Sequence, residues 1–186
     1  MDPHAPYDPP EGFRREFASG VRDPDAGSFE HIRGLAFGEI PRTPQTDQDL
    51  VDLYDAEIAF ADHQFGLLLE NLRVRGLYDE MVIVFVSDHG EGFYEHGIQG
   101  HGWDLYGESI QVPLILKPPR TSSGKRVPEL AQQIDLLPTL LELEQLPEVE
   151  SLEFDEETRQ QLKDPGPKPS KAGRHKVRPV QPSHPS

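Results

Sequence analysis

The sequence predicts an α/β fold in which helices flank a mixed, mostly parallel sheet. Two observations carry this prediction. Residues 46–76 have the apolar periodicity of a long helix, and residues 81–86 are β-branched or aromatic with no polar alternation. Such an apolar run is typical of a strand that is buried on both faces of a parallel sheet. A helix that leads directly into a buried strand is a unit of layered α/β proteins.

The first 44 residues carry only weak structural signals. Four of the first ten residues are proline, and because proline fixes φ and lacks a backbone donor, this segment is predicted to be a loop. Between residues 11 and 44, glycine and proline interrupt each short apolar cluster. We therefore expect irregular structure with one short helix in this region.

The long helix is the most strongly predicted element. Thr46 is the expected N-cap, Asp47 and Asp49 suit the positive end of the helix dipole, and Gly76 is expected at C′. The predicted apolar face consists of Leu50, Tyr54, Ile58, Ala61, Phe65, Leu68 and Leu72. The acidic residues within the helix are assigned to a solvated or polar-packed face rather than to catalysis. They are Asp55, Glu57 and Asp62.

Further elements are predicted after the first strand. A short helix is expected over residues 103–111 and a second buried strand over residues 112–117. Asp135 is the expected cap of a helix over Leu136–Leu143, with Pro138 in its first turn, where a missing N–H is tolerated. Residues 161–186 form a basic, proline-rich tail that has too little apolar surface to fold, so we expect disorder there.

Composition excludes several classes of protein. The net charge of −15 argues against nucleic acid as a partner, because nucleic-acid surfaces need Lys and Arg to neutralise phosphates. The chain has no cysteine, which excludes a disulfide framework, a thiolate zinc site and a cysteine nucleophile. No apolar run approaches the roughly 20 residues of a membrane span, and no signal peptide is recognisable. We therefore expect a soluble chain, whose compartment remains unknown.

A candidate site follows the strand at residues 81–86. Asp88 and His89 come directly after it, at the edge where open α/β sheets bind ligands. Three histidines, His89, His96 and His101, lie within thirteen residues of a glycine-rich loop. An Asp after a strand is often only a helix cap, and a single His is usually structural. Several polar groups on one flexible loop lack such an explanation, and they suit a divalent metal with a bound oxyanion.

Several short motifs, which follow one another in a consistent order, carry a family resemblance. They are Tyr54-Asp-Ala-Glu-Ile58, Gly76-Leu-Tyr-Asp79, Val86-Ser-Asp-His-Gly-Glu91, Glu95-His-Gly97, His101-Gly, Glu108-Ser-Ile-Gln-Val-Pro-Leu-Ile115 and Asp135-Leu-Leu-Pro-Thr-Leu-Leu141. Together with the proline-rich opening loop, they closely resemble the sulfatase family of the alkaline-phosphatase-like superfamily. The resemblance covers about residues 1–143. It implies a partial alkaline-phosphatase-like fold, with a partial sulfatase catalytic domain at residues 1–160.

The resemblance also implies a function and a set of site residues. It implies a sulfuric ester hydrolase that acts on a sulfate-ester small molecule or sugar with one divalent cation, usually Ca²⁺, with Mg²⁺, Mn²⁺ or Zn²⁺ as alternatives. Asp88 and His89 match the family's second pair of metal ligands. His101 falls near the position that contacts the sulfate and assists the leaving group, and His4 matches a histidine that binds the sulfate or the nucleophile. The role of His96 stays open.

Two family features are absent from the sequence: the first pair of acidic metal ligands, and the Cys/Ser-x-Pro-x-Arg motif that yields the formylglycine nucleophile. We therefore expect the C-terminal part of a sulfatase catalytic domain, from a truncated or misdelimited reading frame, that is inactive alone and self-associates through an exposed sheet edge. Two alternatives stay open. One is a phosphodiesterase or phosphonate hydrolase of the same superfamily, and the other is a non-catalytic metal- or oxyanion-binding remnant.

Overall fold

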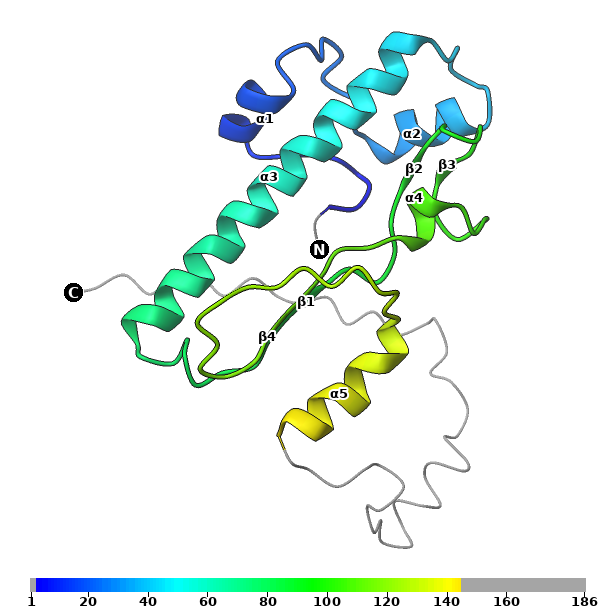
Figure 1. The fold of residues 1–186 in the computed structure, drawn as a ribbon. Coiled ribbons are helices and arrows are strands. Elements are labelled where there is room, and N and C mark those ends of the chain that lie inside the picture. Colours follow the sequence, from blue (N-terminus) through cyan, green and yellow to red (C-terminus); the bar gives the residue numbers. More distant parts are fainter. Residues whose placement is uncertain (1–2, 145–186) are drawn as a thin grey trace, which may run out of the picture. The chain divides into compact units, whose positions relative to one another are not determined.

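The structure is a computed structural model that describes residues 3–144, so the predicted tail lies outside the described residues. The chain divides into two compact units, residues 1–130 and 131–186. The first unit contains α1 (Glu11–Phe17), α2 (Phe29–Ala36), α3 (Pro44–Val74), β1 (Ile83–Val86), β2 (Gly92–Phe93), β3 (Gln99–Gly100), α4 (Gly107–Ile110) and β4 (Leu114–Lys117) (Figure 1). Within the described range, none of the helices combines the length and apolarity that a membrane span requires.

Helix α3 begins three residues earlier than the sequence predicts. Thr43 is the N-cap: its hydroxyl accepts the Thr46 N–H at 3.1 Å, and the Thr46 hydroxyl accepts the Thr43 N–H at 2.9 Å. The prediction of Thr46 as N-cap is therefore wrong. This reciprocal pair is a capping box, and Pro44 at the first helical position reinforces it because proline lacks an N–H. The predicted end is confirmed, since Arg75 is the C-cap and Gly76 follows with φ +68°.

The buried face of α3 differs from the predicted one. Leu53 and Ala56 are buried together with Leu50, whereas Ile58 and Leu68 are exposed. The reason is that the other core residues come from segments that pack on the first half of the helix, and these approach a different side of it. Asp55 and Asp62 are exposed as predicted.

Glu57, the third acidic residue assigned to the polar face of α3, is buried. Its Oε1 accepts the backbone N–H of Asp8 at 2.7 Å. The carboxylate thus holds the N-terminal loop against the helix, which agrees with a packing role.

Two short helices, rather than one, lie between residues 11 and 44. Helix α2 begins after Ser28, whose hydroxyl accepts the N–H of His31 at 3.1 Å, and it buries Ile32 and Leu35. Helix α1 has no buried residue, but its Phe13 packs edge-on against Phe60 of α3 with ring centroids 5.4 Å apart. The prediction of one helix is wrong because Ser28 provides a second N-cap among the glycines and prolines.

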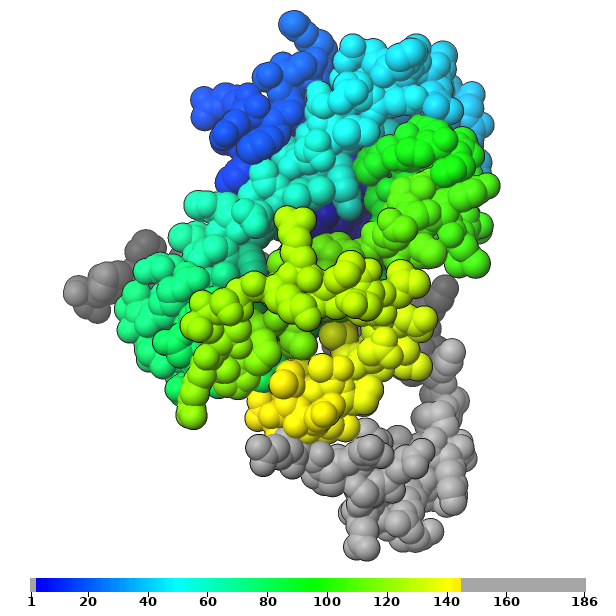
Figure 2. Space-filling model, in the orientation of Figure 1, coloured from blue at the N-terminus to red at the C-terminus, as the bar shows by residue number. Residues whose placement is uncertain are grey.

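Tyr7 from the proline-rich loop lies in the core of the first unit. The core residues are Tyr7, Ala18, Ala26, Ile32, Leu35, Leu50, Leu53 and Ala56. The N–H of Tyr7 donates to the Gly27 carbonyl at 2.8 Å, and a Cβ at position 27 would collide with the Tyr7 carbonyl oxygen. In Figure 2 the dark blue N-terminal residues are seen between cyan α3 and the green β2–β3 hairpin. The loop is therefore irregular, as predicted, and is also part of the core.

The strands form two small antiparallel sheets. β1 pairs with β4, from Ile83 opposite Lys117 to Val86 opposite Leu114, and β2 pairs with β3. A mixed α/β architecture is confirmed, but the predicted parallel pairing and full burial of the first strand are wrong: Val86 is 38% exposed. An apolar run indicates that a strand tends to be buried, but it does not indicate whether the strand pairs in a parallel or an antiparallel direction. In the part of the chain that the structure describes, β1 and β4 each pair on one side only, and self-association through such an edge stays a prediction.

The remaining predicted elements are shorter than expected or capped differently. The helix expected over 103–111 is the single turn of α4, and β4 begins at Leu114 rather than at residue 112. In the second unit, α5 (Leu136–Leu143) matches the prediction, after a 3₁₀ turn over Gln133–Asp135. Asp135 does not cap α5 with its side chain. Its carboxylate instead accepts the Gln132 N–H at 2.8 Å and so caps the 3₁₀ turn.

Candidate active site

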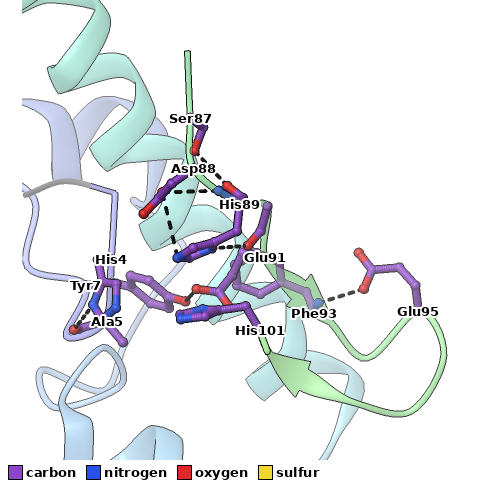
Figure 3. A network of polar contacts seen from close by, with 11 residues as sticks. His4, Ala5, Tyr7, Ser87, Asp88, His89, Glu91, Phe93, Glu95 and His101 are labelled. Atoms are coloured by element: carbon purple, nitrogen blue, oxygen red, sulfur yellow. Dashed lines mark hydrogen bonds and ion pairs between the residues drawn. The ribbon is translucent and has the colours of Figure 1, made fainter. Parts of the chain in front are cut away.

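The structure brings together the four residues that the sequence singles out. His4 comes from the N-terminal loop, Asp88 and His89 follow β1, and His101 follows β3 (Figure 3). The rings of His89 and His101 are stacked with centroids 3.7 Å apart, and His4 meets His101 edge-on at 5.4 Å. Nε2 of His89 lies 3.8 Å from a carboxylate oxygen of Asp88. Segments far apart in the sequence thus form one polar cluster.

The loop that carries this cluster packs tightly against α4. The N–H of Gly90 donates to the Ser109 carbonyl at 2.9 Å, and a Cβ at position 90 would collide with the Glu108 carbonyl oxygen. Gly100 has φ +91°, a conformation that favours glycine because it has no Cβ. These two glycines let the backbone follow a path that places His89 and His101 side by side.

Each of the three clustered histidines has its Nδ1 next to an oxygen. Nδ1 of His4 lies 2.6 Å from the Ala5 carbonyl, Nδ1 of His89 lies 2.7 Å from the Gly90 carbonyl, and Nδ1 of His101 lies 3.2 Å from Oε1 of Glu91. Carbonyl and carboxylate oxygens only accept hydrogen bonds, so Nδ1 is the protonated nitrogen in each ring. Nε2 is then the nitrogen that can accept a proton or bind a ligand.

Glu91 is a site residue to which the sequence motifs assign no role. Its side chain is only 5% exposed, and while Oε1 accepts from His101, Oε2 accepts the hydroxyl of Tyr7 at 3.2 Å. Burial, followed by the charge of Glu91, raises the pKa of Tyr7 well above its ordinary value. Figure 3 shows the Tyr7 hydroxyl pointing to this carboxylate. Glu91 therefore connects the N-terminal loop with the hairpin that ends in His101.

Asp88 and His89 offer two kinds of metal donor next to each other. The Asp88 side chain is 85% exposed, and its Oδ1 accepts the His89 N–H at 3.1 Å. A carboxylate and a neutral imidazole are both ordinary metal ligands. Over residues 3–144, however, no three acidic or imidazole side chains are arranged to hold a metal ion. The pair fits part of a metal site.

His96 belongs to a different cluster. Its Nδ1 lies 2.6 Å from Oε1 of Glu108, and its ring stacks on Tyr106 with centroids 3.8 Å apart. The hydrogen bond from His96 holds the pKa of Glu108 below its usual range. These contacts join the hairpin turn to α4, which gives His96 a structural role.

The chain matches a known protein family and several of its members. The family model described as Sulfatase matches residues 1–145. Arylsulfatase K of Xenopus laevis is 36% identical over 103 residues, which cover 55% of this chain and 19% of that protein. An endo-4-O-sulfatase of Bacteroides thetaiotaomicron is 25% identical over 146 residues, which cover 76% of this chain and 27% of that protein. The chain thus spans between about a fifth and about a quarter of the length of these relatives.

A solved structure resembles the fold as well. The phosphonate monoester hydrolase from Silicibacter pomeroyi superposes with a TM-score of 0.54 at 26% sequence identity. The match covers 71% of this chain and 24% of that one. The described fold therefore resembles about a quarter of that solved structure.

Proposed function

Since the chain belongs to the sulfatase family, we propose that its polar cluster is part of a site that hydrolyses sulfate esters. The observation that supports this most directly is the convergence of His4, His89 and His101, each with its Nδ1 engaged by an oxygen. The arrangement directs the reactive nitrogen of each ring away from its backbone or carboxylate partner. A bare Nε2 suits a metal ion, and an Nε2 that has taken up a second proton can donate to an oxygen of a sulfate group.

In this proposal, Asp88 and His89 are two ligands of a divalent cation. Ca²⁺ is the expected ion by family resemblance, and Mg²⁺, Mn²⁺ or Zn²⁺ are alternatives. A bound cation stabilises negative charge on the transferring group as a Lewis acid. Ca²⁺ takes six to eight ligands, nearly all of them oxygen, and of this pair only the Asp88 carboxylate supplies oxygen, so the two side chains provide only a small part of its shell. We therefore expect weak binding by this chain.

His101 and His4 are the proposed oxyanion and leaving-group residues. His101 is half-buried against His89, and His4 is exposed at the edge of the cluster. A neutral imidazole accepts a proton at its bare nitrogen, and the protonated ring can then donate that proton to a leaving group. The two rings meet at 5.4 Å, and this proximity supports a joint action on one sulfate group.

Turnover requires a nucleophile that this sequence does not contain. The 186 residues include no cysteine and no serine in the x-Pro-x-Arg context that formylglycine formation needs. Without a covalent nucleophile, only attack by water remains, which is a far slower route. We expect the 186-residue chain alone to bind metal and oxyanion but not to turn over sulfate esters at enzyme-like rates.

Calorimetric titration of the chain with CaCl₂ tests the metal part of the proposal. We expect weak binding heat that Asp88→Ala abolishes. The matched control is Asp62→Ala, because it removes an exposed carboxylate of α3 with the same change in charge. Unchanged affinity in Asp88→Ala, or equal loss in both variants, would remove Asp88 from the site.

A second candidate function is hydrolysis of phosphodiesters or of phosphonates. The structural match to a phosphonate monoester hydrolase favours this alternative. Binding of inorganic sulfate and of phosphate, measured with Ca²⁺ present in wild type and in His101→Gln, compares the two. Preference for sulfate that depends on His101 supports the sulfatase proposal, and preference for phosphate supports the alternative. Binding without turnover of an aryl sulfate, even after mixing with the N-terminal half of a homologous sulfatase, would support a non-catalytic remnant.

A further inference from the structure

We propose that Glu91, held in place by Tyr7, is a positioning residue that fixes the tautomer and the ring orientation of His101. The carboxylate keeps the proton on Nδ1 and so presents Nε2 of His101 to the site. The catalytic meaning of this arrangement rests on the proposed function, whereas the tautomer itself does not. The proposal follows from three observations on the hydrogen bonds, the hairpin and the N-terminal loop.

The hydrogen bond of His101 differs in kind from those of the other two histidines. His4 and His89 use the carbonyl of the next residue in the chain, Ala5 and Gly90 respectively, so local backbone geometry determines their tautomers. The partner of His101 is a side chain ten residues earlier in the sequence. Its tautomer therefore depends on one carboxylate that a substitution can remove.

The register of the β2–β3 hairpin places Glu91 opposite His101. Gly92 pairs with Gly100, and Phe93 pairs with Gln99. Continuing this antiparallel register by one residue aligns Glu91 with His101, and directly opposed side chains lie about 5 Å apart at Cβ. The hairpin thus aligns the carboxylate with the imidazole through backbone pairing, which is a stable basis for a positioning contact.

The second oxygen of Glu91 is held from the N-terminal loop. Tyr7 donates its hydroxyl to Oε2 at 3.2 Å and is only 2% exposed. The Tyr7 ring packs against Tyr54 of α3 and Phe93 of β2, with centroids 5.6 and 6.1 Å away. Because both oxygens accept from defined donors, the carboxylate has one preferred orientation. It also links the loop that carries His4 to the hairpin that carries His101.

Replacing Glu91 with Gln removes the discrimination between tautomers. A carboxylate only accepts, so it favours a proton on Nδ1, whereas an amide both donates and accepts. Since the Tyr7 hydroxyl also donates and accepts, the amide can take either orientation. We therefore expect the His101 proton to redistribute from Nδ1 toward Nε2 in Glu91→Gln.

Long-range ¹H–¹⁵N NMR of the full labelled chain tests the proposal, because protonated and bare ring nitrogens have well-separated ¹⁵N shifts. Spectra are recorded at about pH 9, above the range in which imidazoles ordinarily titrate, and His101→Gln assigns the His101 signals. We expect Nδ1–H with a bare Nε2 in wild type and a shift toward Nε2–H in Glu91→Gln. The matched control is Glu108→Gln, which makes the same change beside His96 and should leave His101 unaltered.

A wild-type His101 with its proton on Nε2, or unchanged His101 signals in Glu91→Gln, would overturn the proposal. The His89 signals report whether the loop is still folded in each variant. Tyr7→Phe provides a second test, because loss of the Tyr7 donor should shift or broaden the His101 signals and leave those of His96 unchanged. The samples contain neither metal nor ester. Failure of calcium binding would therefore not contradict the role proposed for Glu91, and a negative result in these spectra would not bear on the metal site.

Discussion

Replacing Tyr7 with Phe deletes one hydroxyl from the core of the first unit and keeps the ring. The ring of Tyr7 contacts Tyr54 and Phe93, and Phe preserves these contacts. The lost group is the donor to Oε2 of Glu91, whose side chain is only 5% exposed. The substitution therefore isolates the energy of one hydrogen bond to a buried carboxylate.

The expected loss of stability is about 1.5–2 kcal/mol. Hydrogen bonds to charged groups contribute roughly 1.5–3 kcal/mol, and loss of one partner leaves the other desolvated. The distance of 3.2 Å between the Tyr7 hydroxyl and Glu91 exceeds the roughly 2.5–3.0 Å that is usual for O–H···O bonds, so the lower part of the range applies. For a chain of this length, the loss corresponds to a fall in Tm of about 3–8 °C.

Urea and thermal unfolding measure this loss, with Tyr54→Phe as the matched control. Tyr54 belongs to the same ring cluster, and its hydroxyl makes no hydrogen bond that the structure records with residues 3–144. We expect Tyr54→Phe to change the free energy of unfolding by no more than about 0.5 kcal/mol. Equal losses in the two variants, or no loss in Tyr7→Phe, would refute the assigned role of the Tyr7 hydroxyl.

The pH dependence of stability provides a second measurement on the same variant. Burial, then the charge of Glu91, raises the pKa of Tyr7 in the folded state, whereas an unfolded tyrosine ionises near pH 10. The unfolded state therefore loses protons first, and stability falls as the pH rises above about 10. Since burial also raises the pKa of Tyr54, Tyr7→Phe should reduce this alkaline slope without abolishing it. An identical slope in wild type and Tyr7→Phe would contradict the reasoning.

Three further substitutions test the backbone features of the first unit by urea unfolding. Thr43→Ala removes the N-cap of α3 and should cost about 1 kcal/mol; unchanged stability would reject Thr43 as the cap. Gly66→Ala should stabilise α3 by about 0.5–1 kcal/mol, because a Cβ there has no atom within 4 Å. Gly90→Ala should cost about 1–3 kcal/mol, because the new Cβ meets the Glu108 carbonyl, and similar effects of the two glycine substitutions would contradict this difference in packing.

The helices show how far local patterns determine this fold. The periodicity of residues 46–76 and Gly76 predict α3 and its end correctly, because both signals are local. The start is wrong because Thr43 and Thr46 are both good N-cap residues, and the reciprocal bonds between them decide which one caps. The buried face is shifted because α1, α2 and Tyr7 pack on α3 from positions that its own sequence does not encode.

The strands show the limit of apolar patterns. Residues 83–86 form a strand as predicted, but β1 pairs antiparallel with β4 and is only partly buried. Apolar composition indicates that a strand seeks burial, and strand direction depends on the path of the connecting chain. Here the hairpin and α4 return the chain to β1 in the opposite direction.

The candidate site was predictable where chemistry is local and was missed where it depends on distant contacts. His4, Asp88, His89 and His101 are identified by their motifs, and the structure brings them together. Glu91 meets Tyr7 across 84 positions of sequence, a contact that no pattern in either segment indicates. The contact between Glu91 and His101 nevertheless has a signal in the sequence, because these two residues are equidistant from the turn of a short hairpin.

The Glu91 carboxylate couples stability to site geometry. One of its oxygens accepts from the buried Tyr7 and the other from the half-buried His101, so loosening either contact affects the orientation of the same group. A substitution in the core at Tyr7 should therefore alter the orientation of the His101 ring. The effect would pass through Glu91, because the described hydrogen bonds include none between Tyr7 and His101. The N-terminal loop thus has two connected roles: Tyr7 completes the core, and through Glu91 it orients a histidine of the proposed site.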